Sequence, residues 1–201
     1  MTSYTSLANK LNLPKDLPIT PDWSAAADFL QLIVDHSLNT QPVTILECSS
    51  GLTSLMLSRC CQINQQGQVY SLENGKEYAL KTQAHLDHHQ LAQYATIIHA
   101  PLEAYVIGER NYSWYRINEI PQQAIDMLVI DGPPGFIQKH SRYPALPLLW
   151  NKLADHCTIF LDDAAREEEQ ELVTMWLQEY PDLKHEYIDT ERGCSILIIN
   201  K

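Results

Sequence analysis

The amino-acid sequence predicts an α/β protein built on a mostly parallel β-sheet with helices on both faces. Short apolar runs without polar alternation, such as "VTILE" at residues 43–47, are typical of strands buried on both faces. These runs alternate with longer stretches of helical periodicity, which is the pattern of parallel strands joined by crossover helices. The last two strand-like runs are joined only by "TERG" at residues 190–193. Because this connection is too short for a crossover, we expect the two strands to pair antiparallel at one edge.

The individual elements follow in order along the chain. Residues 1–20 show little periodicity, and we expect an irregular arm there. A first helix is predicted in residues 20–37, with Thr20 as its N-cap. Further helices are predicted at residues 51–62, 76–90, 143–156 and 164–180. Strands are predicted at residues 43–47, 68–73, 94–100, 124–131, 157–163, 183–189 and 194–201.

The bulk composition indicates a single domain over residues 1–201. With 45% hydrophobic residues, the chain can bury a sizeable core. No repeat or linker divides it, so we expect an N-terminal arm and helix at residues 1–41 followed by the sheet-bearing core at residues 42–201. The formal net charge of -11 argues against a nucleic acid or an anionic membrane as partner, because both reward clustered Lys and Arg.

The cysteines and the start of the chain bear on the cellular compartment. The five cysteines contain no CxxC pair, and Cys60 and Cys61 are adjacent, which is poor geometry for a mutual bridge. Reduced thiols and a cytoplasmic location are therefore expected. The start "MTSYTSLANK" lacks the basic and apolar segments of a signal peptide, and no apolar run approaches the length of a membrane span.

The turn after the first predicted strand, "ECSSGLTS" at residues 47–54, is the first candidate ligand site. In a doubly wound sheet, ligands bind beyond the carboxyl ends of the strands, and small residues let the backbone approach them. A phosphate-binding loop would end in GK[ST], which is absent. A dinucleotide fingerprint would have glycines in place of Ser49 and Ser54, so a nicotinamide cofactor is disfavoured but stays an alternative.

Two carboxylates end successive predicted strands. Glu47 at the mouth of the first turn suits a cationic ligand and would repel a pyrophosphate, and S-adenosylmethionine carries both a sulfonium and an ammonium group. Glu73 ends the next strand, a position from which an acid can accept both hydroxyls of a ribose. Glu47 could instead cap a helix or pair with a lysine, and Glu73 could be an N-cap. Because both acids end successive strands, ligand binding is favoured over capping or an ion pair.

These segments and several others give the chain a family resemblance. "ECSSGLTS" and "VIDGPPG", with "TPDWSAAADFL" upstream and "IIHAPLEAY", "RYPALPLLW" and "LDDAAREEEQ" downstream, extend over nearly the whole chain. The chain resembles the class I S-adenosylmethionine-dependent methyltransferases, and most closely the bacterial subgroup with the motifs E-x-G-S-G-x-S-T and D-G-P-P-G. The resemblance implies a Rossmann-like, doubly wound, seven-stranded sheet with a reversed last strand, which agrees with the terminal strand pair predicted above.

The resemblance also implies which residues hold the cofactor. Glu47, Ser49 and Gly51 would line its methionine end, and Glu73 would accept the ribose hydroxyls. Ser49 stands where the family has its first glycine, and its hydroxymethyl group could crowd the cofactor or hydrogen-bond to it. Residues 100–102 would lie near the adenine. The candidate cofactor residues are Glu47, Ser49, Ser50, Gly51, Thr53, Glu73, Asn74, Ala100, Pro101, Leu102 and Asp131.

Carboxylates also follow two later strands. Asp131 opens "DGPPG" and is the candidate catalytic residue, since it could accept a proton from a substrate hydroxyl, although a turn-starting Asp is the alternative. Asp162 and Asp163 end the next strand, and with Asp131 they could bind Mg²⁺. A divalent cation is not favoured, because metal-dependent relatives carry an Asp-Asn pair here. Asp162 or Asp163 could instead cap a helix starting at Ala164.

The loop after "DGPPG" carries the candidate substrate contacts. Arg142, together with Lys139 and His140, suits an acidic or phosphorylated substrate, and it equally suits ordinary salt bridges. Trp23 and Tyr143 could wall the substrate pocket or belong to the core. The candidate substrate residues are Trp23, Arg142, Tyr143 and Asp162.

The whole pattern predicts transfer of a methyl group from S-adenosylmethionine to an oxygen or nitrogen of a small molecule. Positioning would supply most of the catalysis, and a base could in addition remove a proton. Residues 103–121, rich in Tyr and Trp, are predicted to cover the pocket. The sequence does not decide the oligomeric state, and a homodimer is possible. Two alternatives are a non-catalytic binder of S-adenosylmethionine or a nucleotide, and a nicotinamide-dependent oxidoreductase. A third is a protein or nucleic-acid methyltransferase, which would usually carry an extra recognition domain or a basic surface, and this compact acidic chain shows neither.

Overall fold

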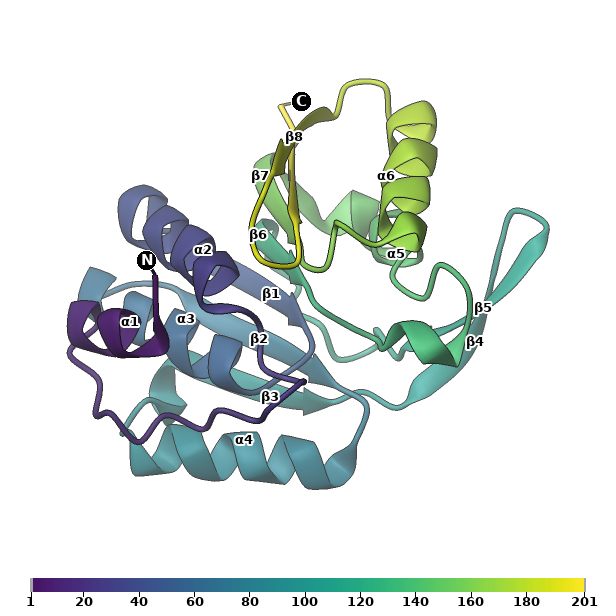
Figure 1. Cartoon of the computed structure of the whole chain (residues 1–201). Helices are drawn as coiled ribbons and strands as arrows, with labels where there is room; N and C mark the ends of the chain where they lie inside the picture. The colour runs from purple at the N-terminus through teal and green to yellow at the C-terminus, as the bar shows by residue number, and fades with distance from the viewer. Residues whose placement is uncertain (1, 201) are drawn as a thin grey trace.

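The computed structural model describes residues 2–200 and is organised around one seven-stranded sheet (Figure 1). Its strands are β1 (Thr44–Cys48), β2 (Gln68–Glu73), β3 (Ala95–His99), β6 (Ile125–Ile130), β7 (Leu153–Leu161), β8 (Lys184–Ile188) and β9 (Cys194–Ile198). They lie in the order β3-β2-β1-β6-β7-β9-β8, and β9 runs antiparallel to both of its neighbours while the pairs from β3 to β7 are parallel. The predicted doubly wound sheet with a reversed last strand is confirmed.

Helices cover both faces of this sheet. The α-helices are α1 (Tyr4–Lys10), α2 (Ala27–Thr40), α3 (Leu52–Asn64), α4 (Lys76–His88), α5 (Ala145–Leu149) and α6 (Glu167–Glu179), and the short 3-10 helices are η1 (Ala92–Tyr94), η2 (Gly135–Ile137) and η3 (Trp150–Lys152). Side chains from α1 to α4, among them Phe29, Leu55 and Leu86, pack with Ile45 of β1 in one buried cluster. The neighbouring Leu46 belongs to a second cluster on the opposite face. Because successive strand residues point to opposite faces, β1 is buried on both sides, as its unalternating sequence predicts.

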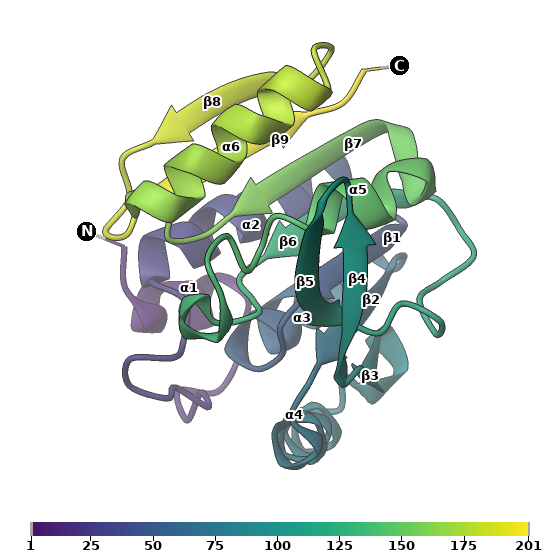
Figure 2. The same cartoon turned by 90° about the vertical axis from the view of Figure 1, so that its right-hand side faces the viewer.

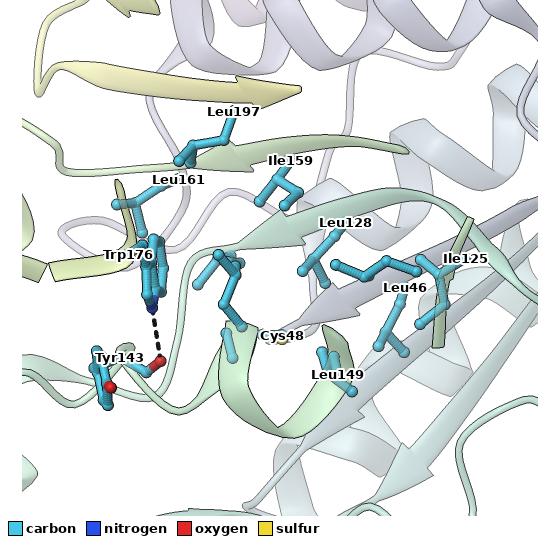
Figure 3. Close-up of a cluster of buried hydrophobic side chains, with 14 of the residues drawn as sticks. Leu46, Cys48, Ile125, Leu128, Tyr143, Leu149, Ile159, Leu161, Trp176 and Leu197 are labelled. Carbon is cyan, nitrogen blue, oxygen red and sulfur yellow. Dashed lines mark hydrogen bonds between the residues drawn. The ribbon is translucent and has the colours of Figure 1, made fainter. Parts of the chain in front are cut away.

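The second cluster holds α5 and α6 against the sheet (Figure 3). Leu46 and Leu128 from two adjacent strands pack with Leu149 of α5 and Trp176 of α6, and all four are fully buried. Burial of each such side chain contributes roughly 1.5–3 kcal/mol. The indole nitrogen of Trp176 also donates a 3.0 Å hydrogen bond to the carbonyl of Tyr143, so α6 is tied to the loop that precedes α5.

Two expectations for the N-terminal region are wrong. Residues 4–10 form α1 instead of an irregular arm, because Ser3 and Ser6 complete a capping box at its start. The next helix, α2, begins at Ala27, and Thr20 is not its N-cap. Asp22 has a φ of +64°, which a right-handed helix cannot contain, and residues 20–24 therefore form a turn.

The helix predicted at residues 143–156 is also only partly present. It ends in η3, and β7 begins directly afterwards at Leu153. Leu153 pairs with Ile125 at the start of β6, so the backbone of this segment finds its hydrogen bonds in the sheet. Pairing with β6 has therefore overridden the helical preference of the residues from Leu153 onward.

A β-hairpin follows β3 and was not predicted. It consists of β4 (Leu102–Ile107) and β5 (Arg110–Tyr115), which pair antiparallel and form a separate two-stranded sheet. The turn between them contains Gly108 with a φ of +60°, a conformation that glycine adopts without strain. The hairpin tip projects from the body of the molecule (Figures 1 and 2). Its base is anchored in the core by Trp114, which is fully buried.

All five cysteines are buried, and none of them forms a disulfide. Burial raises the pKa of Cys48, Cys60, Cys61 and Cys194 well above the usual range, so these thiols are held in their neutral, unreactive form.

Within the described residues, no helix has both the length and the apolar character that a membrane crossing requires.

Candidate active site

The turn between β1 and α3 buries a carboxyl group in a cluster of serine hydroxyls. Glu47 is fully buried. Its Oε2 accepts hydrogen bonds from Ser54 Oγ at 2.6 Å and from Ser71 Oγ at 2.7 Å, and its Oε1 accepts a longer one from Ser49 Oγ at 3.3 Å. No described Lys or Arg forms an ion pair with Glu47, so a lysine pair does not explain this residue.

The environment of Glu47 makes its charge sensitive to a ligand. Burial raises the pKa of Glu47 to about 7, and the hydroxyl donors offset only part of that effect. An acid with this pKa exists in both protonation states near neutral pH. A cation brought next to it would favour the carboxylate and gain a charge-assisted interaction in a site that water does not reach.

Glu73, at the end of β2, is held in a fixed orientation by two donors. Its Oε1 accepts from the backbone N–H of Gly75 at 2.8 Å, and its Oε2 accepts from Ser50 Oγ at 2.8 Å. Ser50 Oγ also lies 3.0 Å from Thr82 Oγ1 on α4. A carboxylate oxygen can accept more than one hydrogen bond, so Glu73 keeps acceptor capacity for a pair of ligand hydroxyls.

The strand register brings the predicted cofactor residues to one edge of the sheet. Glu47 lies opposite Ser71 on β2, and Glu73 lies opposite His99 on β3. The N–H of Ala100 donates to the carbonyl of Glu73 at 2.8 Å, which places residues 100–102 beside the end of β2. On the other side, the N–H of Asp131 donates to the carbonyl of Cys48, which ends β1. This is the edge at which open α/β sheets bind ligands.

The remaining predicted cofactor residues lie around the same turn. Thr53 is buried in the first turn of α3, while Asn74 and Pro101 are half-buried just beyond β2 and β3. Leu102 is half-buried as the first residue of β4. The proximity of these residues to Glu47 and Glu73 is observed, and their contacts with a cofactor stay a prediction.

Backbone geometry explains why the family has a glycine at the position of Ser49. Ser49 has a φ of +151° and Gly51 a φ of +138°, both in a region that side chains disfavour. A Cβ on Gly51 would meet nothing, so backbone conformation and not space makes glycine suitable there. Ser49 adopts the same kind of conformation with a side chain, and it is therefore strained.

A buried acidic cluster lies at the ends of β6 and β7. Carboxylate oxygens of Asp131, Asp162 and Asp163 lie within 4.8 Å of one another. The structure thus brings together the three residues predicted as metal ligands. The proposed capping of α6 by Asp162 or Asp163 is wrong, because α6 begins only at Glu167 and its N-cap position is Arg166.

The guanidinium of Arg142 lies inside this cluster. Its Nη2 is 2.7 Å from Asp163 Oδ2, 2.8 Å from the carbonyl oxygen of Asp131 and 3.5 Å from Asp131 Oδ1. Its Nη1 donates to the carbonyl oxygen of Asp162 at 2.8 Å and lies 3.9 Å from Glu169 Oε1. Arg142 was expected on a loop as a substrate contact, but it is 2% exposed and engaged with the protein's own acids. Of the two interpretations, the structure supports the internal salt bridge.

Crowding among the acids changes their protonation. Burial raises the pKa of Asp131 well above its usual range, and the nearby Asp162 raises it further while Arg142 opposes the shift. Burial raises the pKa of Asp162 to about 6, and Asp163 adds to that effect. Carboxyl groups with raised pKa values are better proton acceptors once ionised, which suits Asp131 to the role of a general base.

The aromatic candidates separate into one surface residue and one core residue. Trp23 is 62% exposed, and its ring lies edge-on to that of Phe136, with centroids 6.5 Å apart. Phe136 lies in η2, directly after the "DGPPG" segment, so Trp23 lies against the loop that follows β6. Tyr143 is buried, and its hydroxyl donates to Glu179 Oε1 at 2.6 Å. The structure therefore places Tyr143 in the core, the second of the two interpretations.

Several residues of the site were missed from sequence. Ser71 and Tyr115 gave no local signal, because each reaches the site only through strand pairing or the hairpin. The hydroxyl of Tyr115 lies so close to Gly132 that a Cβ there would be 2.4 Å from it. Gly132 is thus required by close packing against β5. Ser54 could have been considered, since it lies in the first turn of the helix that directly follows the strand bearing Glu47.

The fold and the site together define a class I methyltransferase, with carboxyl groups at the ends of β1, β2 and β6 of a seven-stranded sheet whose last strand is reversed. A family model described as "Methyltransferase domain" matches residues 46–164, more than half of the chain. The chain belongs to this methyltransferase family.

Solved structures share this fold across nearly the whole chain. An O-methyltransferase from Streptomyces achromogenes involved in tomaymycin synthesis, solved with S-adenosylmethionine, is 13% identical with a TM-score of 0.67, covering 98% of this chain and 88% of that one. An O-methyltransferase from Bacillus cereus, solved with S-adenosylhomocysteine, is 12% identical with a TM-score of 0.67 and covers 98% and 89%. A methyltransferase from Geobacter sulfurreducens is 14% identical with a TM-score of 0.66 and covers 98% and 86%. No curated protein sequence matches this chain.

Proposed function

We propose that this protein transfers a methyl group from S-adenosylmethionine to an oxygen atom of a small molecule. The observation that carries the proposal is the pair of carboxyl groups at the ends of β1 and β2. Glu47 is buried among hydroxyls with a pKa of about 7, and Glu73 is oriented by two donors. Such a pair suits a ligand that has a cationic end and a ribose. The bound ligands and O-methyltransferase descriptions of the Streptomyces and Bacillus proteins support the same cofactor and acceptor atom.

The residues around the first turn fit this cofactor. Glu47 would face the cationic methionine end, and the strained Ser49–Gly51 turn would present its backbone to it. Glu73 would accept the ribose hydroxyls, and Ala100 with its neighbours would lie near the adenine. The cofactor supplies an activated methyl group on a sulfonium, which is a good leaving group.

The protein's own contribution to the reaction is positioning and proton removal. Asp131 is the candidate base, because it ends β6 at the same edge and its raised pKa makes it a better acceptor. Asp131 would accept the proton of the acceptor hydroxyl, so that the hydroxyl oxygen could attack the methyl group that the cofactor would supply. Alignment of these atoms would supply most of the rate enhancement.

The setting of this reaction is part of the proposal. One domain over residues 1–201 would carry it out in the cytoplasm, which the buried cysteines without disulfides support. A small-molecule substrate agrees with the net charge of -11, which does not suit nucleic acid. Trp23 lies on the surface near the "DGPPG" loop as a candidate substrate contact. A lid formed by residues 103–121 and a homodimer stay predictions.

Titration calorimetry tests the cofactor assignment. Wild-type protein should bind S-adenosylmethionine and S-adenosylhomocysteine, and Glu73→Ala should bind both more weakly, by roughly tenfold or more, because two charge-assisted hydrogen bonds are lost. The matched control is Glu77→Ala, which removes an exposed acid from the first turn of α4 and should bind normally. Binding of a nicotinamide dinucleotide in place of S-adenosylmethionine would overturn the assignment. Product analysis by mass spectrometry with candidate hydroxyl compounds then tests transfer.

A further inference from the structure

We infer that Arg142 is the permanent cation of the acidic cluster and occupies the position of a divalent metal, so that this protein works without one. The inference concerns the cluster formed by Asp131, Asp162 and Asp163. It goes beyond the proposed methyl transfer, and it is tested by metal binding, which does not depend on any activity.

The spacing of the cluster is that of a metal site. One oxygen from each of the three carboxylates lies within 4.8 Å of the others. Oxygens that coordinate one Mg²⁺ or Ca²⁺ ion lie about 2.0–2.6 Å from it, so they can be up to about 5 Å apart. Arg142 Nη2 already lies against two of these carboxylates, 2.7 Å from Asp163 Oδ2 and 3.5 Å from Asp131 Oδ1, while its Nη1 bonds the main-chain carbonyl of Asp162.

Arg142 is built into this position. The residues on both sides of it are anchored, since Ser141 Oγ donates to the carbonyl of Pro133 at 3.0 Å and the carbonyl of Tyr143 accepts from Trp176 Nε1 at 3.0 Å. The guanidinium also bonds backbone carbonyls at the ends of β6 and β7, those of Asp131 and Asp162. To leave the cluster it would have to give up contacts with both strands at once.

The charge balance favours the guanidinium over an added metal. Asp163 Oδ2 already pairs with two cations, because Arg166 Nη1 lies 3.0 Å away in addition to Arg142. A divalent ion placed among the same oxygens would lie next to the Arg142 guanidinium and be repelled by it. A guanidinium keeps its charge at every pH at which the protein is folded, so it neutralises Asp131 and Asp163 without an exchangeable ligand.

Binding of Mn²⁺ alone, followed by the electron paramagnetic resonance signal of the free ion, tests the inference. Wild-type protein should leave the signal of millimolar Mn²⁺ unchanged. Arg142→Met keeps the apolar stem and removes the guanidinium, and it should bind one Mn²⁺ at least roughly tenfold more tightly than wild type. The carboxylates of Asp131 and Asp163 would lose their internal cation, and Asp162 Oδ2 already has no hydrogen-bond partner. Arg142→Met combined with Asp163→Asn should lose that binding. Arg142→Lys is the matched control, which keeps a cation and should bind no metal.

Two results would overturn the inference. The first is Mn²⁺ binding by the wild-type protein that Asp163→Asn abolishes, which would mean that Asp162 Oδ2 and Asp163 Oδ1, both buried without a protein partner, bind a metal beside Arg142. The second is a folded Arg142→Met variant that binds no Mn²⁺. If Arg142→Met is unfolded without metal, circular dichroism should show that millimolar Mn²⁺ restores its helices, and a failure to restore them counts against the inference.

Discussion

The hydroxyl oxygen of Ser54 lies 2.6 Å from Glu47 Oε2, although a strand-to-helix turn separates the two residues. This hydrogen bond joins the carboxyl end of β1 to the first turn of α3. It holds the buried carboxyl group at the edge where the cofactor is proposed to bind. Changes around Glu47 are therefore expected to alter both the affinity for the cofactor and the pH dependence of stability.

Removing the Ser54 hydroxyl should weaken cofactor binding. Ser54→Ala takes away a donor that stabilises the Glu47 carboxylate, and a hydrogen bond to a charged group contributes roughly 1.5–3 kcal/mol. We expect the affinity for S-adenosylmethionine at pH 7.5 to fall by roughly tenfold or more in titration calorimetry. Ser58→Ala is the control, because its hydroxyl bonds a backbone carbonyl of the same helix. Equal losses in both variants would show that helix packing, and not Glu47, is responsible.

The buried carboxyl group should make stability depend on pH. The pKa of Glu47 is raised from 4.5 to about 7 in the folded state, so the folded protein holds a proton that the unfolded chain releases between these values. Its contribution is full below pH 4.5 and is lost as the pH rises towards 7, by about 3 kcal/mol. Glu47→Gln should not show this loss. Urea denaturation of both proteins from pH 5 to 8 measures it, and parallel pH profiles would refute the prediction.

Relief of backbone strain at Ser49 should stabilise the protein. Its φ of +151° costs roughly 1–3 kcal/mol for a residue with a side chain, while a glycine adds roughly 0.5–1 kcal/mol of unfolded-state entropy. Ser49→Gly should therefore raise the free energy of unfolding by about 1 kcal/mol in urea. Ser50→Gly, one residue on, has no such strain to relieve and loses the hydrogen bond to Glu73, so it should destabilise. Destabilisation by Ser49→Gly would mean that its weak bond to Glu47 matters more than strain.

A methyl group on Gly132 should collide with Tyr115. The added Cβ would lie 2.4 Å from the Tyr115 hydroxyl and 3.2 Å from the carbonyl of Cys48, and such overpacking costs roughly 1–3 kcal/mol. Gly132→Ala should lower the melting temperature, and Tyr115→Phe in the same chain should restore part of it. Gly135→Ala is the control, since a Cβ there meets no atom. If Tyr115→Phe restores nothing, the backbone contact with Cys48 is the dominant clash.

Asp131 should be needed for turnover once a substrate is found. Asp131→Asn cannot accept the proton of the acceptor hydroxyl and should lower kcat by roughly 10²–10⁴-fold, with a smaller effect on cofactor affinity. The exposed Asp155→Asn on β7 should leave kcat unchanged. Rates from methylated product over time provide the measurement. An unaffected kcat in Asp131→Asn would remove this residue from the mechanism.

Much of the fold and of the cofactor edge was predictable because the signals are local. A short β-branched apolar run without alternation, as in β1, favours a strand buried on both faces, and the brief link between β8 and β9 requires an antiparallel pair. The acids Glu47 and Glu73 follow from their place at strand ends. Local signals failed at two places. At Asp22 a positive φ angle produces a turn in place of the predicted helix, and Leu153 joins the sheet because it pairs with β6.

The sequence by itself determined the alternation of the main-sheet strands with helices, the reversed last strand and the carboxyl groups at the strand ends, since each depends on residue spacing along the chain. Only the tertiary structure decided what those carboxyl groups contact. The sequence left Arg142 equally suited to a substrate contact and to a salt bridge, and the pairing of β6 with β7 decides for the salt bridge by bringing Asp131 and Asp163 to it. Tyr115 reaches Gly132 through the hairpin for the same reason. Contacts between residues far apart in sequence depend on where the sheet places these residues. A local sequence pattern does not encode how close two such residues come in space.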